Sequence, residues 1–170
     1  AINLLIMAGL VIPVTHSSSN GIPLGAESDQ KKRKMLVFDT GVFQRLLGLD
    51  ISSYLLENDF NFINKGAIAE LFVGLEIIKS LSCYRQQELY YWQRETASSN
   101  AEVDYVFQSN HSIIPIEVKS AKKGSMQSMY QFLKEKNLNQ GIRFSLENYS
   151  SYNSVNVYPL YAVSNFITRE

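Results

Sequence analysis

The sequence contains few of the residues that build disulfides or zinc sites. Its 170 residues include one cysteine, Cys83, and two histidines, His16 and His111. A single cysteine cannot form a disulfide within the chain, and this usage is typical of a reducing compartment such as the cytoplasm. The sequence also lacks C-x-x-C and H-E-x-x-H motifs, which argues against structural zinc. We expect both histidines on the surface, because they fall in polar stretches that indicate loops.

Net charge and long apolar runs are also lacking. Sixteen Lys and Arg residues balance sixteen Asp and Glu residues, which excludes a strongly basic, histone-like DNA-binding protein. Nucleic-acid binding would therefore need a local basic patch. The longest apolar run, residues 1–14, is interrupted by Asn3 and Gly9 and is too short to span a bilayer. No Met or basic segment precedes it, so we expect a chain cut from a longer protein rather than a signal peptide.

The sequence does contain enough apolar material for a folded domain. Apolar residues make up 45% and charged residues 19% of the chain, a balance typical of globular proteins. A domain of this length buries about 70% of its unfolded surface, which supports a core without disulfides. One domain, or one domain with a small appendage, is therefore expected.

Residue patterns predict a mixed α/β fold from residue 39 to residue 170. Residues 61–81 give the strongest helical signal, with two apolar stripes at spacings of three and four. Strands are predicted at 88–93, 102–108, 113–119, 141–146 and 155–163, and a second helix at 125–136. The resulting order of helix, three strands, helix and two strands differs from an alternating parallel fold.

Residues 1–38 have a different pattern. The end of a helix over 1–10 leads to a short strand, 11–15, a polar loop, a basic run at 30–34 and a second strand, 35–38. Two strands separated by a long polar tip indicate a wing or a wide hairpin, and we expect the basic run to be a solvated loop. A helix over 42–49 follows, with Asp39 or Thr40 as its N-cap.

The candidate site lies on two neighbouring predicted strands. Glu117 and Lys119 are two residues apart, so their side chains leave the same face of a strand. If residues 109–112 form an even-length turn, paired residue numbers sum to 221, which places Asp104 opposite Glu117 and Glu102 opposite Lys119. An odd-length turn would break this register. The apolar residues that would share the opposite face are Val103, Tyr105, Phe107, Ile116 and Val118.

Neighbouring carboxylates repel each other unless a cation lies between them. Asp104 and Glu117 offer only oxygen ligands, which favour Mg²⁺ or Mn²⁺ over zinc. Such an ion binds phosphate oxygens and lowers the pKa of water, and Lys119 would orient the water or stabilise charge on phosphorus. Glu70 lies on an apolar stripe of the first helix, where a carboxylate needs a partner such as Lys119 or a water at the metal. Glu76 is an alternative to Glu70.

Simpler interpretations remain open for each of these residues. Asp104, Glu117 and Lys119 could form a salt-bridge ladder across a hairpin, which contributes little to stability. Glu70 could pair with a nearby Lys or Arg. Aromatic residues 90–92 could stack on bases, but packing explains them more simply, and we assign Trp92 to the core.

The order of elements and the acidic residues resemble the PD-(D/E)xK nuclease superfamily. Asp104 and the E-x-K motif of Glu117 and Lys119 match its signature, and Glu70 lies on the preceding helix. This resemblance implies a restriction-endonuclease-like core with the order helix, three-stranded meander, helix, strand. It also implies that Asp104 and Glu117 hold Mg²⁺ or Mn²⁺, that Lys119 positions the attacking water, that Glu70 acts through water, and that the substrate is DNA.

A second resemblance covers nearly the whole chain. The segments that carry it are A-G-L-V at 8–11, G-I-P-L-G at 21–25, L-V-F-D-T-G at 36–41, G-A-I-A-E at 66–70, L-Y-Y-W at 89–92, A-E-V-D at 101–104 and I-P-I-E-V-K-S at 114–120. They are similar to the uncharacterised C-terminal domain of a bacterial and archaeal AAA-type ATPase family, in which a P-loop ATPase and a winged helix precede this domain.

That resemblance implies that residues 1–38 are a remnant of the winged helix. The sequence contains no G-x-x-x-x-G-K-[ST] motif, so ATP would act only through a domain outside it. Two functions follow as hypotheses. One is a metal-dependent nuclease or a DNA-binding relative, and the other is a non-catalytic docking domain of the ATPase with a degenerate nuclease fold, which the zero net charge favours.

Overall fold

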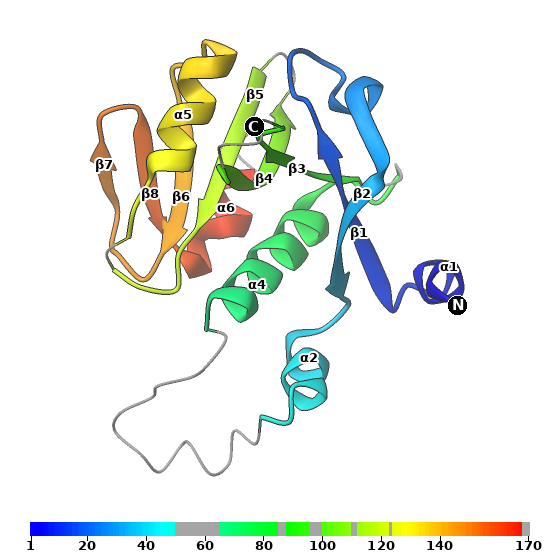
Figure 1. Cartoon of the computed structure of the whole chain (residues 1–170). Helices are drawn as coiled ribbons and strands as arrows, with labels where there is room; N and C mark the ends of the chain where they lie inside the picture. Colours follow the sequence, from blue (N-terminus) through cyan, green and yellow to red (C-terminus); the bar gives the residue numbers. More distant parts are fainter. Residues whose placement is uncertain (50–64, 85–87, 96–99, 110–111, 123, 168–170) are drawn as a thin grey trace, which may run out of the picture.

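Five helices and eight strands form in the part of the chain that the structure describes (Figure 1). The computed structural model describes residues 1–49, 65–84, 88–95, 100–109, 112–122 and 124–167. The helices are α1 (Ile2–Met7), α2 (Thr40–Leu46), α4 (Lys65–Ser80), α5 (Gln127–Lys136) and α6 (Val163–Ile167), and 3₁₀ turns lie at Leu24–Glu27 and Leu160–Ala162. The strands are β1 (Val11–Ser17), β2 (Ser28–Val37), β3 (Leu89–Gln93), β4 (Glu102–Ser109), β5 (Ser112–Val118), β6 (Gly141–Ser145), β7 (Ser150–Tyr152) and β8 (Val155–Pro159).

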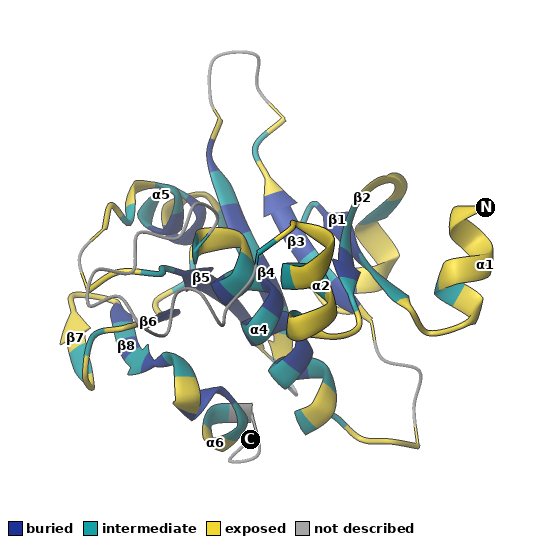
Figure 2. Ribbon diagram, turned by 90° about the horizontal axis from the view of Figure 1, so that it is seen from below, coloured by how far each residue is buried: buried dark blue, intermediate teal, exposed yellow. Residues whose placement is uncertain are grey.

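The strands form one mixed sheet with the order β2-β1-β3-β4-β5-β6-β8-β7. β3, β4 and β5 are antiparallel neighbours, whereas β5, β6 and β8 run parallel to one another. α4 and α6 pack on one face of the sheet, and α5 packs on the other face (Figures 1 and 2). The mixed α/β fold predicted from the sequence is therefore confirmed.

Residues 1–38 contribute two strands to this sheet. β1 pairs antiparallel with β2 and parallel with β3. The prediction of a basic loop at 30–34 is wrong, because these residues lie in β2, an edge strand that can expose consecutive charged side chains. The prediction that His16 lies on the surface is also wrong. His16 lies in β1 and is 2% exposed, and its Nε2 is 3.1 Å from the carbonyl oxygen of Gln93. The domain boundary at residue 39 and the winged-helix origin stay predictions.

The predicted elements on the C-terminal side agree in type with most of the structure. The helix predicted over 61–81 is present from Lys65 to Ser80, and residues 61–64 lie outside the described part. Asp39 caps α2 as predicted, accepting a hydrogen bond of 2.8 Å from the backbone N–H of Val42. The strand predicted over 155–163 is too long, because β8 ends at Pro159 and a 3₁₀ turn and α6 follow. β7 was not predicted.

α4 packs closely against the centre of the sheet. Gly74 makes this approach possible, since a Cβ at this position would lie 2.7 Å from Leu36 Cδ1 and would collide with Tyr105. The Tyr105 hydroxyl donates a hydrogen bond of 2.7 Å to the backbone carbonyl of Glu70. This contact ties α4 to β4 and places Glu70 beside the first half of that strand.

A β-bulge in β4 changes which residues face α4. Tyr90 pairs with Val106 and Trp92 pairs with Val103, so two residues of β4 lie opposite the single residue between Tyr90 and Trp92. Val103 packs with Trp92 in the core cluster under α5, whereas Tyr105 packs in the cluster under α4. The prediction that Val103 and Tyr105 share a face is therefore wrong. The core assignment of Trp92 is confirmed.

The predicted register of the β4–β5 hairpin is confirmed where the strands pair. The pairs run from Tyr105 with Ile116 to Ser109 with Ser112, and each pair of residue numbers sums to 221. The turn residues 110–111 lie outside the described part, so nothing tests the surface position predicted for His111.

Within the described residues, no helix is both long and apolar enough to cross a membrane.

Candidate functional site

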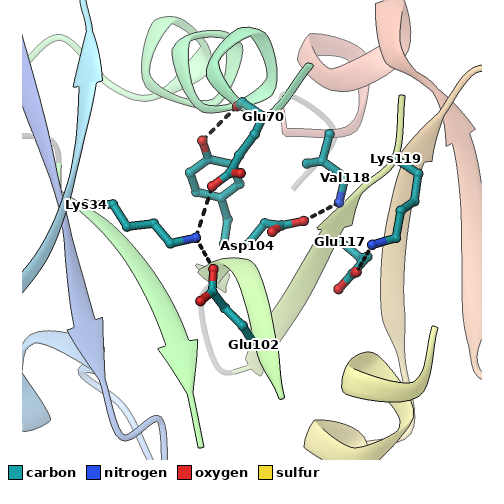
Figure 3. Close-up of polar contacts among 8 residues, drawn as sticks. Lys34, Glu70, Glu102, Asp104, Glu117, Val118 and Lys119 are labelled. Atoms are coloured by element: carbon teal, nitrogen blue, oxygen red, sulfur yellow. Dashed lines mark hydrogen bonds and ion pairs between the residues drawn. The ribbon is translucent and has the colours of Figure 1, made fainter. Parts of the chain in front are cut away.

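The candidate site lies where β4 and β5 separate. The last pair between the two strands is Tyr105 with Ile116, and beyond it β5 continues along β6 alone. The backbone N–H of Lys119 donates to a carbonyl of β6, so the N–H of Val118 points toward β4. It donates a hydrogen bond of 2.7 Å to the Asp104 carboxylate (Figure 3). The side chain of Asp104 thus takes the place of the backbone acceptor that β4 no longer supplies.

Asp104 is held in surroundings that oppose its negative charge. Burial, and then the charges of Glu117 and Glu70, raise the pKa of Asp104 to about 7. The Val118 N–H and the ammonium of Lys34 act in the opposite direction but do not cancel these effects. A cation beside Asp104 would relieve this unfavourable interaction.

Glu117 is the most buried acid of the site, with a side chain 6% exposed. Its Oε1 pairs with the Lys119 ammonium, while its Oε2 is buried and has no hydrogen-bond partner among the described residues. Burial raises the pKa of Glu117, and the charges of Lys119 and Arg143 partly oppose this rise. A buried carboxylate oxygen without a partner is unusual in folded proteins, and a cation or a water would satisfy it.

Arg143 lies next to Glu117 on β6, at the paired position of the parallel ladder. It is 2% exposed, and its Nη2 donates a hydrogen bond of 3.1 Å to the carbonyl of Lys122. Its Nε is buried without a partner among the described residues. This guanidinium thus holds the loop that follows β5, directly beside Lys119.

A second ionic cluster joins three elements on the α4 side. The ammonium of Lys34, on β2, lies 3.0 Å from Glu70 Oε1 and pairs with Glu102 on β4 (Figure 3). Burial alone would lower the pKa of Lys34, but the charges of Glu70 and Glu102 outweigh it and raise the pKa. Glu70 is therefore paired with a lysine, as the simpler interpretation of the sequence predicted for this residue.

A family model matches residues 65–163, which is more than half of the chain, and its description is domain of unknown function DUF4143. The chain belongs to the DUF4143 family. Domains of this family are commonly found with AAA ATPases. Neither the curated proteins nor the solved structures compared with the chain gave a match.

All four predicted site residues fall within the DUF4143 match. The structure brings Asp104, Glu117 and Lys119 together at the end of β5, and it places Glu70 near Asp104 on α4 (Figure 3). Glu102 contacts Lys34 rather than Lys119, contrary to the predicted ladder. Among the described residues, no group of three or more His, Cys, Asp and Glu side chains has the geometry of a metal site.

Lys34 is the site residue that the sequence argument missed, and it lies outside the DUF4143 match. Its position relative to Leu36 is the one available signal. The two residues are two apart on β2, and Leu36 is buried under α4, so Lys34 points to the same face. The loop predicted at 30–34 has no such alternation, so no face could be assigned to Lys34 from the sequence.

An apolar cavity of about 630 Å³ adjoins the candidate site. Phe72 of α4 forms one wall, and Ser120, Leu146 and Leu160 form another. These three residues lie just after β5, β6 and β8, so the cavity opens at the carboxyl ends of three parallel strands. Pockets of this size and position commonly bind ligands or partner side chains.

Proposed function

We propose that this domain is a metal-dependent phosphodiesterase that acts on DNA, in which Asp104 and Glu117 hold Mg²⁺ or Mn²⁺. The observation that carries the proposal is the unpartnered, buried Oε2 of Glu117 close to the destabilised carboxylate of Asp104. Both groups would gain a partner from one divalent cation, and hard divalent ions prefer carboxylate oxygens.

The arrangement of the core supports the same proposal. α4 is followed by three antiparallel strands, then by α5 and by β6 parallel to β5. We propose on this basis a restriction-endonuclease-like core, in which the E-x-K residues would lie at the end of the third strand. In a cytoplasmic protein built with an ATPase, the module would act on DNA that the ATPase engages.

Two carboxylates are sufficient ligands for Mg²⁺, which keeps several waters and needs only one or two protein carboxylates. When bound, the ion supplies Lewis-acid stabilisation of the phosphate and lowers the pKa of water. Lys119 is held by Glu117 at the rim, with its side chain 31% exposed. It would orient the attacking water and stabilise the charge that develops on phosphorus. Glu70 would act through water, beside the Asp104 carboxylate.

The test combines metal binding with cleavage. Mn²⁺ and Mg²⁺ are titrated into the wild type, Asp104→Ala/Glu117→Ala and a matched control, Glu76→Ala/Glu135→Ala. The control removes two acids that the structure pairs outside the site, Glu76 with Lys79 and Glu135 with Arg94. We expect saturable binding that only the site variant loses. Linear, circular and single-stranded DNA should be cut in a metal-dependent way, and Lys119→Ala should lose cutting but keep binding. Absence of metal binding at millimolar concentrations would contradict the proposal.

A second candidate function is a docking domain of the ATPase. The apolar cavity beside α4 and the zero net charge of the chain favour it. The two functions differ in their dependence on salt, because phosphate contacts release counterions. Affinity for DNA that falls steeply with salt would exclude docking as the sole role, whereas absence of DNA binding would favour it.

A further inference from the structure

The ammonium of Lys34 is enclosed by groups from three neighbouring elements. Glu70 comes from α4, Glu102 from β4, and the ring of Tyr91 from β3 lies with its centroid 5.0 Å from the nitrogen. The lysine side chain is only 26% exposed. Two carboxylates and an aromatic face are the partners that a fixed cation requires.

The two sides of the site differ in which carboxylate oxygens already have a cationic partner. Glu70 and Glu102 share the ammonium of Lys34. Asp104 has no ion pair among the described residues, and Glu117 pairs through one oxygen while the other is unpartnered. A further cation would pair with the oxygens of Asp104 and Glu117 that no ammonium holds, whereas beside Glu70 and Glu102 it would have to displace the ammonium of Lys34.

We propose that the Lys34 ammonium occupies the position of a second cation, so that the site accepts a single divalent ion, held by Asp104 and Glu117. This inference rests on the proposed function, because it assumes the metal that the phosphodiesterase needs. Many phosphodiesterases clamp phosphate between two metal ions about 4 Å apart. In this protein a lysine from β2 supplies the second positive charge.

Calorimetric titration of Mn²⁺ tests the inference through stoichiometry rather than activity. We expect the wild type to bind one ion per chain. Lys34→Met keeps the apolar stem but removes the charge, and we expect it to bind a second ion at least about tenfold more tightly than the wild type, as removal of a nearby charge implies. Adding Glu102→Gln to this variant should remove the second ion and keep the first. Lys32→Met is the matched control, because Lys32 lies on the same strand and pairs outside the site with Glu95.

The outcomes separate this inference from the proposed function. Two ions in the wild type overturn the inference, and this measurement needs no variant. One ion in both the wild type and Lys34→Met, with equal affinity, also overturns it and leaves the nuclease proposal standing. No ion in the wild type overturns both the inference and the nuclease proposal, whether or not Lys34→Met binds one.

Discussion

Replacing Asp104 with asparagine is expected to stabilise the protein above pH 7 and to leave its stability nearly unchanged below pH 4. The asparagine is neutral, and its side-chain oxygen can still accept the hydrogen bond from the Val118 N–H. It removes the charge that burial, Glu117 and Glu70 disfavour. The variant therefore imitates the protonated form of Asp104 at every pH.

The sign and size follow from the pKa of Asp104 in the two states. Folding raises this pKa from 3.8 to about 7, so the folded state binds more protons than the unfolded state between these values. Stability of the wild type therefore falls as pH rises through this window. A shift of about three units at about 1.4 kcal/mol per unit gives an upper limit of about 4 kcal/mol. Since Asp104 is half-buried and partly screened, we expect a gain of about 2–4 kcal/mol for the variant at pH 8.

Urea denaturation followed by the fluorescence of Trp92 measures this difference at several pH values in the presence of a chelator. The difference between variant and wild type should grow between pH 4 and pH 7 and then stay constant. Asp29→Asn, at an exposed acid of β2, should change stability by less than about 0.5 kcal/mol throughout. A difference that does not change with pH, or a loss of stability at pH 8, would refute the reasoning. Millimolar Mn²⁺ should reduce the gain by stabilising the wild type.

Three further predictions concern the packing and capping of the helices. Gly74→Ala should destabilise the protein by about 1–3 kcal/mol in thermal unfolding, because the new methyl group collides with Tyr105. Gly66→Ala on the same helix is the control. The space there is open, so this substitution should instead stabilise the protein by about 0.5–1 kcal/mol. Asp39→Ala removes the N-cap of α2 and should cost about 1 kcal/mol in urea, while Asp39→Asn should recover most of it. Phe132→Ala should cost about 3–5 kcal/mol, because this ring of α5 is fully buried against the sheet, and a smaller cost would mean that this core collapses around the cavity.

Local patterns predicted the elements whose own residues determine them. The apolar stripes of α4 and the nearly continuous apolar run of β5 reflect burial within a single segment, so the sequence was sufficient to find both. The β4–β5 register followed from an even-length turn, which is also local. β2 was predicted too short, because an edge strand tolerates the charged residues that usually mark a loop. The burial of His16 was not predicted, because its partner, the carbonyl of Gln93, is distant in sequence.

The candidate site was predictable only in part for the same reason. The motif identified Glu117 and Lys119, which contact each other within one strand. Lys34 and Glu70 are 36 residues apart, and only the packing of α4 across β2 shows that they meet. The β-bulge that turns Tyr105 toward α4 has no glycine or proline to mark it. In a regular strand, Tyr105 would share a face with Val103, on the side away from α4. Its hydroxyl could then not reach the carbonyl of Glu70.

The distribution of partners favours a functional site over a salt-bridge ladder. In a ladder across two strands, opposite charges pair in solvent, and each group gains a partner at small cost. The only described ion pair of Glu117 is with Lys119 on its own strand, and Asp104 has none among the described residues. Glu117 Oε2 and Arg143 Nε are buried without partners on adjacent strands. Burying polar and charged groups without partners lowers the stability of the fold. Such groups concentrate where proteins bind ligands or perform chemistry.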